Sequence, residues 1–144
     1  VFTVDESTLP AQQDAAMGMY SGMSWAPNMD NPDNKKFVAD FEKDYGYVPG
    51  SYAMQAYDAA RLIDASVKAI GGKVDDKEAL LAQLKKADFK SVRGSFKFNR
   101  NGFPIQDYYL VRVAKRADGK FETQIVSKVF TAQADPFAGE CELK

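Results

Sequence analysis

The sequence predicts a mixed α/β fold in which several helices come first and β-hairpins follow. Apolar residues recur at helical spacing between residues 33 and 86, and apolar and polar side chains alternate over residues 95–130. The predicted strands are too few to cover these helices as the sheet of a complete α/β domain would. We therefore expect the 144 residues to be part of a larger fold or a processed product, also because the chain begins with Val1 and not with Met.

The first third of the chain is expected to hold a short α/β unit, a loop and an amphipathic helix. Pro10 suits the first turn of a short helix over residues 11–17, and a strand follows at residues 19–23. Two prolines and several Asn and Asp residues predict a loop over residues 24–32. The helical spacing of aromatic and apolar residues then predicts a helix over residues 33–45.

The longest predicted helix runs from Ser51 to Ile70. Pro49 and Gly50 interrupt the chain before it, Ser51 is the predicted N-cap, and glycines at residues 71–72 end it. Nearly all other positions are apolar or small, which predicts a helix buried over most of its circumference. The charges of this helix form one narrow stripe, at Asp58, Arg61, Asp64 and Lys68.

The first turn of this helix is the candidate binding site. Tyr52 and Gln55 are three residues apart and therefore lie on one face. The free N–H groups and partial positive charge of a helix N-terminus suit a carboxylate. An aromatic ring and an amide beside them suit a small organic acid or an amino acid. The competing interpretation is that this N-terminus holds only its own cap and water.

The remaining residues predict one more helix and the hairpins. A helix opens at Asp75 and Glu78, which have capping-box spacing, and ends near Lys85–Lys86. The residues after it alternate and turn at sequences typical of hairpins. The expected strands are residues 95–98, 106–113 and 121–130, the turns are residues 99–102 and 118–119, and residues 131–144 are expected to be an extended tail.

Composition excludes several classes of function. The net charge of −1 gives no reason to expect a nucleic-acid partner, and no apolar run approaches the roughly 20 residues that a membrane span needs. The chain lacks histidine, the commonest general base and zinc ligand, and has no glycine-rich phosphate loop. The single cysteine, Cys141, is either an inert thiol or half of a disulfide with a partner outside this sequence. We expect no metal, no cofactor and no enzymatic activity.

Four stretches in this order resemble the C-terminal part of the periplasmic substrate-binding proteins of branched-chain amino acid (leucine/isoleucine/valine-type) ABC transporters. They follow the family pattern F-x-x-x-Y/F-x-x-x-Y-G-x-x-P, then Y-D-A, then G-x-x-x-F-[DN]-x-x-G. Each stretch is weakly specific, but together they extend over nearly all of the chain and about the last third of a family member. The stretches lie at residues 31–38, 45–49, 52–59 and 89–102.

The resemblance implies a type I periplasmic binding protein, whose two Rossmann-like lobes are joined by three crossovers and close on a ligand. In that fold residues 1–22 end the second lobe, and residues 23–104 form the C-terminal part of the first lobe, with three helices and a strand. Residues 105–130 are then a β-hairpin that returns to the second lobe, and residues 131–144 are the tail.

The resemblance also implies where the ligand lies. Tyr52 matches an aromatic residue that lines the apolar side of the ligand, and the loop with Thr3 and Asp5 matches the region where an acidic residue takes the ligand's ammonium group. Asp5 is only near that position, so an amino acid and an aromatic or other organic acid both stay open as ligands. Gln55 is added from its place one turn beyond Tyr52.

The implied role is the extracytoplasmic, periplasmic binding component of a transporter. Its expected partners are a small-molecule ligand, the membrane permease of an ABC transporter and the N-terminal part of the same protein. The chain by itself is expected to self-associate, and no nucleic-acid partner is expected. Two alternatives remain. One is the ligand-sensing domain of a receptor with the same fold, and the other is an α+β interaction module without a small-molecule site.

Overall fold

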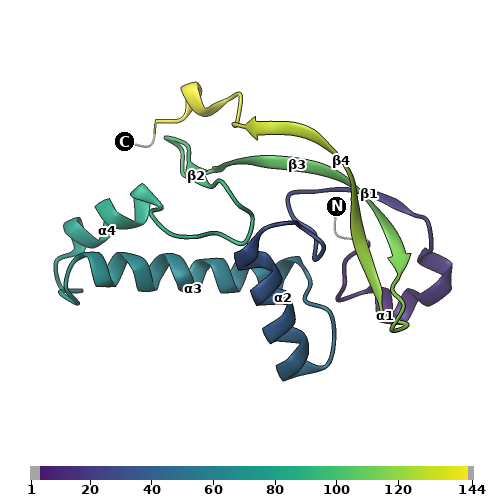
Figure 1. Cartoon of the computed structure of the whole chain (residues 1–144). Helices are drawn as coiled ribbons and strands as arrows, with labels where there is room; N and C mark the ends of the chain where they lie inside the picture. Colours follow the sequence, from purple (N-terminus) through teal and green to yellow (C-terminus); the bar gives the residue numbers. More distant parts are fainter. Residues whose placement is uncertain (1–3, 143–144) are drawn as a thin grey trace.

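A long antiparallel β-ribbon runs through the computed structural model, which describes residues 4–142 (Figure 1). The ribbon consists of β3 (Pro104–Lys115) and β4 (Phe121–Gln133), paired from Lys115 opposite Phe121 to Gln106 opposite Gln133. On its other edge β3 pairs with β1 (Tyr20–Met23) and, at its start, with β2 (Lys97–Phe98). All pairings are antiparallel, so the prediction of β-hairpins is confirmed.

Both ribbon strands are longer than the alternation predicted. β3 begins at Pro104, and β4 continues to Gln133 through the first residues of the expected tail. Asp107 explains the extension, because its Oδ1 accepts the N–H of Ala132 at 2.8 Å. The described remainder of the tail, residues 134–142, is also anchored and not extended, since Asn101 donates to Asp135 at 2.6 Å and a short 3₁₀ helix, η2, forms at Ala138–Glu140.

The helices follow the prediction closely. The first is α1 (Leu9–Gln12), and the 3₁₀ turn η1 (Gln13–Ala16) follows it directly. It is followed by α2 (Pro32–Tyr45), α3 (Ser51–Ala69) and α4 (Lys77–Lys86). None of the described helices is long and apolar enough to cross a membrane.

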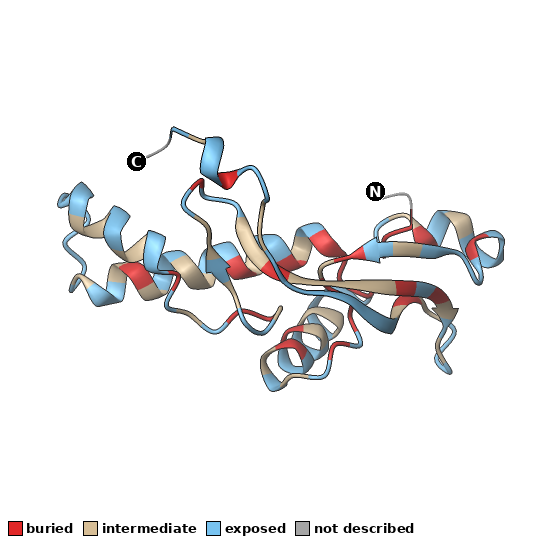
Figure 2. Ribbon diagram, turned by 90° about the horizontal axis from the view of Figure 1, so that it is seen from above, coloured by how far each residue is buried: buried red, intermediate tan, exposed pale blue. Residues whose placement is uncertain are grey.

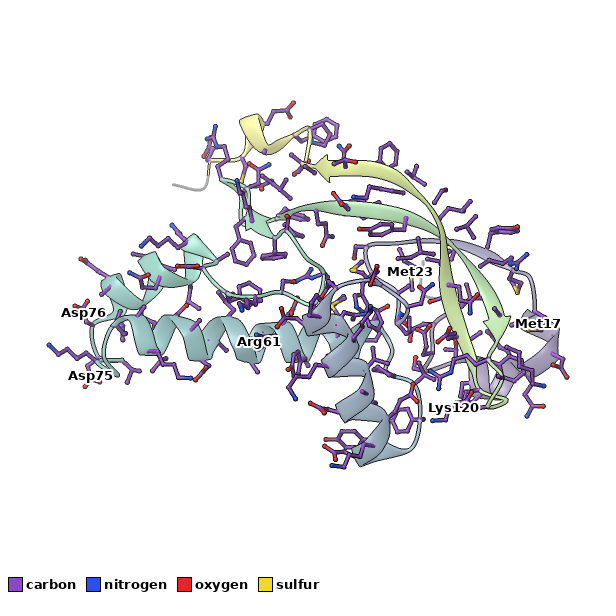
Figure 3. All side chains as sticks on the ribbon, viewed as in Figure 1. Met17, Met23, Arg61, Asp75, Asp76 and Lys120 are labelled. Atoms are coloured by element: carbon purple, nitrogen blue, oxygen red, sulfur yellow. The ribbon has the colours of Figure 1, made fainter. Side chains whose placement is uncertain are left out.

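Helix ends depart from the prediction in two places. The N-cap of α3 is Gly50 and not Ser51. The N-cap of α4 is Asp76 and not Asp75, because the side chain of Asp76 accepts the N–H of Ala79 at 3.0 Å. Figure 3 shows Asp75 and Asp76 together at the turn between α3 and α4. A one-residue error in a cap is ordinary when only spacing is available.

The main core lies where α2 and the first half of α3 meet the ribbon. Its buried members are Trp25, Met29, Phe37, Met54 and Val92, with Tyr109 and Ile125 of the ribbon packed against them. Buried residues gather in this middle region in Figure 2 and continue along the ribbon toward its tip, whereas α4 and the second half of β4 are mostly exposed.

The expectation that α3 is buried over most of its circumference is wrong for the described structure. Its buried residues are few, and Ile63 is 55% exposed. The polar stripe is also divided, because Asp58 is buried whereas Asp64 and Lys68 pair in solvent. Exposed apolar residues on α3 and β4 are the basis for expecting association with another chain segment or another copy, which stays a prediction.

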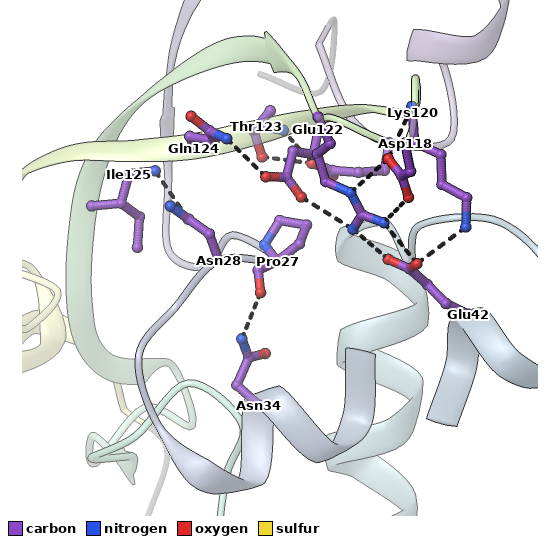
Figure 4. Close-up of polar contacts among 12 residues, drawn as sticks. Pro27, Asn28, Asn34, Glu42, Asp118, Lys120, Glu122, Thr123, Gln124 and Ile125 are labelled. Carbon is purple, nitrogen blue, oxygen red and sulfur yellow. Dashed lines mark hydrogen bonds and ion pairs between the residues drawn. The ribbon is translucent and has the colours of Figure 1, made fainter. Parts of the chain in front are cut away.

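Ion pairs tie the tip of the ribbon to α2 (Figure 4). Arg116 donates from Nη1 and Nη2 to the two oxygens of Glu42 at 2.6 and 2.9 Å, and Lys120 reaches Glu42 at 3.1 Å. The hydrogen bonds from Arg116, and to a smaller extent that from Lys120, hold the pKa of Glu42 below its usual range. The contacts therefore join residues 23–104 to residues 105–130, which the resemblance places in different lobes.

A buried carboxylate, Glu6, fastens the N-terminal segment to β4. Its Oε1 accepts the N–H and the hydroxyl of Thr123 at 2.7 and 2.6 Å, while Oε2 has no hydrogen-bond partner among the described residues. Burial raises the pKa of Glu6 from 4.5 to about 7, although the bonds from Thr123 oppose the shift.

Replacing Glu6 by Gln should stabilise the protein above neutral pH. Between pH 4.5 and about 7 the folded chain keeps a proton that the unfolded chain releases, so stability falls as pH rises through this window. Gln cannot ionise and still offers an oxygen to Thr123. We expect the free energy of unfolding at pH 8 to rise on the order of 3 kcal/mol, and to show no such gain at pH 4. Urea denaturation at both pH values tests this, and an equal change at both would contradict it.

Candidate functional site

The N-terminus of α3 is already occupied by a carboxylate of the chain itself. Asp5 is 1% exposed, and its Oδ2 accepts the N–H of Ser51 at 2.9 Å. Its Oδ1 accepts the N–H and the hydroxyl of Ser7 at 3.0 and 2.8 Å. Burial raises the pKa of Asp5, but these hydrogen bonds outweigh it and leave the pKa below its usual value. The anion that this helix N-terminus favours is therefore supplied from within.

Gly50 makes this contact possible. A Cβ atom at position 50 would lie 2.4 Å from Oδ1 of Asp5, closer than any real contact. Glycine therefore lets the segment with Asp5 reach the backbone of the helix. The loop and the helix that the resemblance assigned to the ligand site are adjacent in space, joined by this carboxylate.

The other predicted site residues lie on or beside the same helix. Tyr52 is 62% exposed in the first turn of α3, and Gln55 is exposed one turn further. Thr3 lies outside the described residues, so its position is not assigned. Tyr52 and Gln55 continue along one face of α3 to Ala59 and Leu62, at spacings of three, four and three residues.

A hollow of about 340 Å³ opens along this face. Its walls are α3, the segment that leads into β2, and the first residues of β3. From α3 come Gln55, Ala59 and Leu62, and from the opposite segment come the rings of Phe89, Phe96 and Phe98. This volume lies within the range of pockets that hold small organic ligands. The structure thus joins one predicted site residue, Gln55, to residues about forty positions later in the chain.

A buried ion pair forms the polar wall of the hollow. Nε of Arg93 donates to Oδ2 of Asp58 at 3.0 Å, and Nη1 of Arg93 donates to Oε1 of Gln106 at 2.9 Å. Asp58 is held in place by the N–H of Val92 at 3.0 Å and by the hydroxyl of Ser91. The interaction ties α3 to the segment before β2 and to the start of β3.

Sequence reasoning missed this pair. Asp58 was assigned to the charged stripe of the helix, and Arg93 carries no motif that separates it from other basic residues. They are 35 positions apart, so no local periodicity connects them. The available signal was only indirect: Asp58 belongs to the Y-D-A stretch and Arg93 to the stretch ending in G-x-x-x-F-[DN]-x-x-G.

Two other hollows are about twice as large. One, of about 690 Å³, is lined by apolar ribbon residues such as Val129 and Phe130, with Asp135 at its edge. The other, of about 700 Å³, lies between α4 and the turn after β2, beside Lys85 and Arg100. Among the described residues, no group of three or more Cys, Asp or Glu is arranged to hold a metal ion.

Comparison with known proteins identifies the family. The model of the periplasmic binding protein family matches residues 1–120. A Leu/Ile/Val-binding protein homologue (number 6) of Brucella abortus is 33% identical over 135 residues, which is 91% of this chain and 34% of that protein.

Solved structures agree in fold. A solute-binding protein of an ABC transporter from Rhodopseudomonas palustris, crystallised with benzoate, is 34% identical with a TM-score of 0.85, over 97% of this chain and 37% of that one. A second solute-binding protein, from R. palustris BisB5 and in complex with 3,4-dihydroxybenzoic acid, is 30% identical with a TM-score of 0.81. The match covers 95% of this chain and 37% of that one. The chain spans about a third of the length of these relatives.

The predicted resemblance and the α/β fold class, part of the two-lobed type I periplasmic binding fold, are thereby confirmed. The chain belongs to the periplasmic binding protein family.

Proposed function

We propose that the protein containing this chain is the extracytoplasmic solute-binding component of an ABC transporter, and that it binds a small carboxylate, with aromatic acids favoured over α-amino acids. The observation that carries the proposal is the 34% identity, over 97% of the chain, to a solute-binding protein crystallised with benzoate. A second relative at 30% identity was crystallised with another benzoic acid. The partners are then the ligand and a membrane permease, the location is the periplasm, and the role is binding without catalysis.

The state of Asp5 supports an aromatic acid. An α-amino acid needs an acidic partner for its ammonium group, and Asp5 is the acid nearest to the position where family members have one. Both of its oxygens already accept hydrogen bonds from Ser7 and Ser51. Freeing Asp5 for a ligand would leave the first N–H of α3 without its partner. A ligand without an ammonium group avoids this cost.

The ligand is proposed to bind between two lobes, with residues 1–22 and 105–130 in one and residues 23–104 in the other. Tyr52 and Gln55 would contact it from α3, and Thr3 and Asp5 would border it from the N-terminal loop. Hinge closure would then bring the two sets of residues together.

Isothermal titration calorimetry of the protein that contains this chain tests the proposal. The panel is benzoate, 4-hydroxybenzoate, 3,4-dihydroxybenzoate, leucine, isoleucine and valine. We expect binding of at least one benzoate and weaker or no binding of the amino acids. Binding of the branched-chain amino acids alone would overturn the preference for aromatic acids. No binding across the panel would overturn the proposed ligand class.

Replacing Tyr52 by Ala should weaken binding of the preferred acid by about 1–3 kcal/mol, the usual cost of losing an aromatic contact. Tyr45→Ala is the matched control, because Tyr45 is also a largely exposed tyrosine but lies at the end of α2. Titration calorimetry compares the two variants. Equal affinities of the Tyr52 variant and the unmodified protein would remove Tyr52 from the site.

A further inference from the structure

We propose that the hollow between α3 and the segment before β2 is a binding site for an aromatic carboxylate, and that Arg93 is the residue that holds the carboxylate group. This inference rests on the proposed function and adds an anchor for the carboxylate; of the residues proposed there, Gln55 also lines this hollow, whereas Tyr52 and Asp5 do not. None of the residues predicted from the sequence supplies a cation for a carboxylate, whereas this hollow does.

The guanidinium of Arg93 is held in one orientation. Asp58 fixes its Nε edge at 3.0 Å and Gln106 fixes Nη1 at 2.9 Å, and the side chain is only 12% exposed. The remaining nitrogen, Nη2, has no hydrogen-bond partner in the part of the chain that the structure describes, residues 4–142. A guanidinium that is fixed in orientation and still has an N–H donor available loses little conformational entropy when it binds a carboxylate.

The walls suit an aromatic ring. Phe96 lies edge-on to both Phe89 and Phe98, with ring centroids 5.6 and 5.0 Å apart. Arg93 stacks on the ring of Phe96, 4.3 Å from its centroid. A benzoate-sized ligand can thus place its ring among aromatic edges and faces while its carboxylate meets the guanidinium. Gln55 adds an exposed amide at the same hollow.

The charges of the hollow select against an ammonium group. Asp58 is its only acidic residue among those described, and the oxygens of Asp58 already accept bonds from Ser91, Val92 and Arg93. An amino acid would therefore bring an unpaired cation close to Arg93. Asp58 also balances the charge of Arg93, so recognition would depend on directed hydrogen bonds and not on long-range attraction.

The two larger hollows fit a carboxylate less well. The ribbon hollow contains Asp135 and no basic residue. The hollow beside α4 has two exposed cations, Lys85 and Arg100, and Arg100 already donates to the carbonyl of Cys141 at 3.0 Å. An exposed cation contributes little to specific binding.

Filling the hollow is the sharpest test, because it leaves the ion pair of Arg93 and Asp58 in place. Ala59 is an exposed residue of α3 at the hollow, and its neighbour Ala60 is exposed outside it. We expect Ala59→Trp to abolish benzoate binding measured by calorimetry and Ala60→Trp to leave it within about twofold. Unchanged affinity of the Ala59 variant would overturn the inference while the proposed function stands. Failure of the unmodified protein to bind any benzoate would overturn both.

A second test separates an anchor from a merely structural arginine. We expect Arg93→Gln to weaken benzoate binding about 10- to 100-fold, as for loss of a charge-assisted hydrogen bond, and to change the affinity for benzamide much less. Arg100→Gln is the control with the same change of charge. An equal loss of affinity for benzoate and benzamide, or a larger loss of benzoate affinity in the Arg100 variant, would show that Arg93 only supports the structure and does not bind the carboxylate.

Discussion

Replacing Asp58 by Ala is expected to lower the free energy of unfolding by about 3–5 kcal/mol, the cost of breaking a buried ion pair from one side. Asp58 is buried within α3 and accepts hydrogen bonds from Ser91, Val92 and Arg93. Without it, the guanidinium of Arg93 and the N–H of Val92 stay in the interior without their partner. Urea denaturation followed by circular dichroism measures the change.

Asp64→Ala is the matched control for this prediction. Asp64 lies on the same helix and also has a basic partner, Lys68 at 2.7 Å, but both side chains are more than half exposed. An exposed pair of this kind contributes about 0.3–0.5 kcal/mol. A similar loss in the two variants would show that the Asp58 network does not hold α3 to the segment before β2.

Replacing Trp25 by Ala should cost a similar amount, about 3–5 kcal/mol, because it empties the centre of the core. Trp25 is 1% exposed and packs with Phe37, whose ring centroid lies 6.2 Å away. Its indole N–H also donates to Oδ1 of Asn34 at 2.7 Å. Since Trp25 is the only tryptophan of the chain, unfolding of the variant is followed by circular dichroism and not by tryptophan fluorescence.

Trp25→Phe separates the two contributions. It keeps an aromatic ring in the core but leaves Asn34 without the indole donor, so we expect a smaller loss of about 1–3 kcal/mol. The amide nitrogen of Asn34 keeps its bonds to the carbonyls of Pro27 and Met29 at 2.9 and 3.0 Å. A loss of stability as large as that of the Ala variant would mean that the hydrogen bond to Asn34, and not the packing of the ring, stabilises this part of the core.

These residues connect stability with the candidate site. The Trp25 core fixes α2 and the first half of α3 against the ribbon. The Asp58 network then fixes Arg93 and the aromatic segment that faces α3. Variants of either residue should therefore also weaken ligand binding, whereas Ala59→Trp tests the hollow without disturbing them.

The sequence by itself determined the local elements. The Asn31–Pro32 start and the Gly46 end of α2 follow from cap chemistry, and Asn31 accepts the N–H of Asn34 at 2.7 Å as expected of an N-cap. The turn at residues 99–102 and the two long strands follow from turn residues and alternation. The family was also readable, because four short motifs recur in one order. Each cap, turn, alternation pattern and motif is read within a few residues of the chain.

Only the tertiary structure decided which charges are buried and which chemistry faces the site. Nothing local distinguishes Asp58 from Asp64, because both occupy the same charged stripe of one helix. The difference arises because a segment 33–35 residues later brings donors to Asp58 and none to Asp64. In the same way Asp5 came to accept the N–H of Ser51 through a contact across 46 residues, which places a carboxylate of the chain itself at the N-terminus of α3. Hydrogen bonds between distant segments depend on how the chain packs, and a spacing rule does not contain that information.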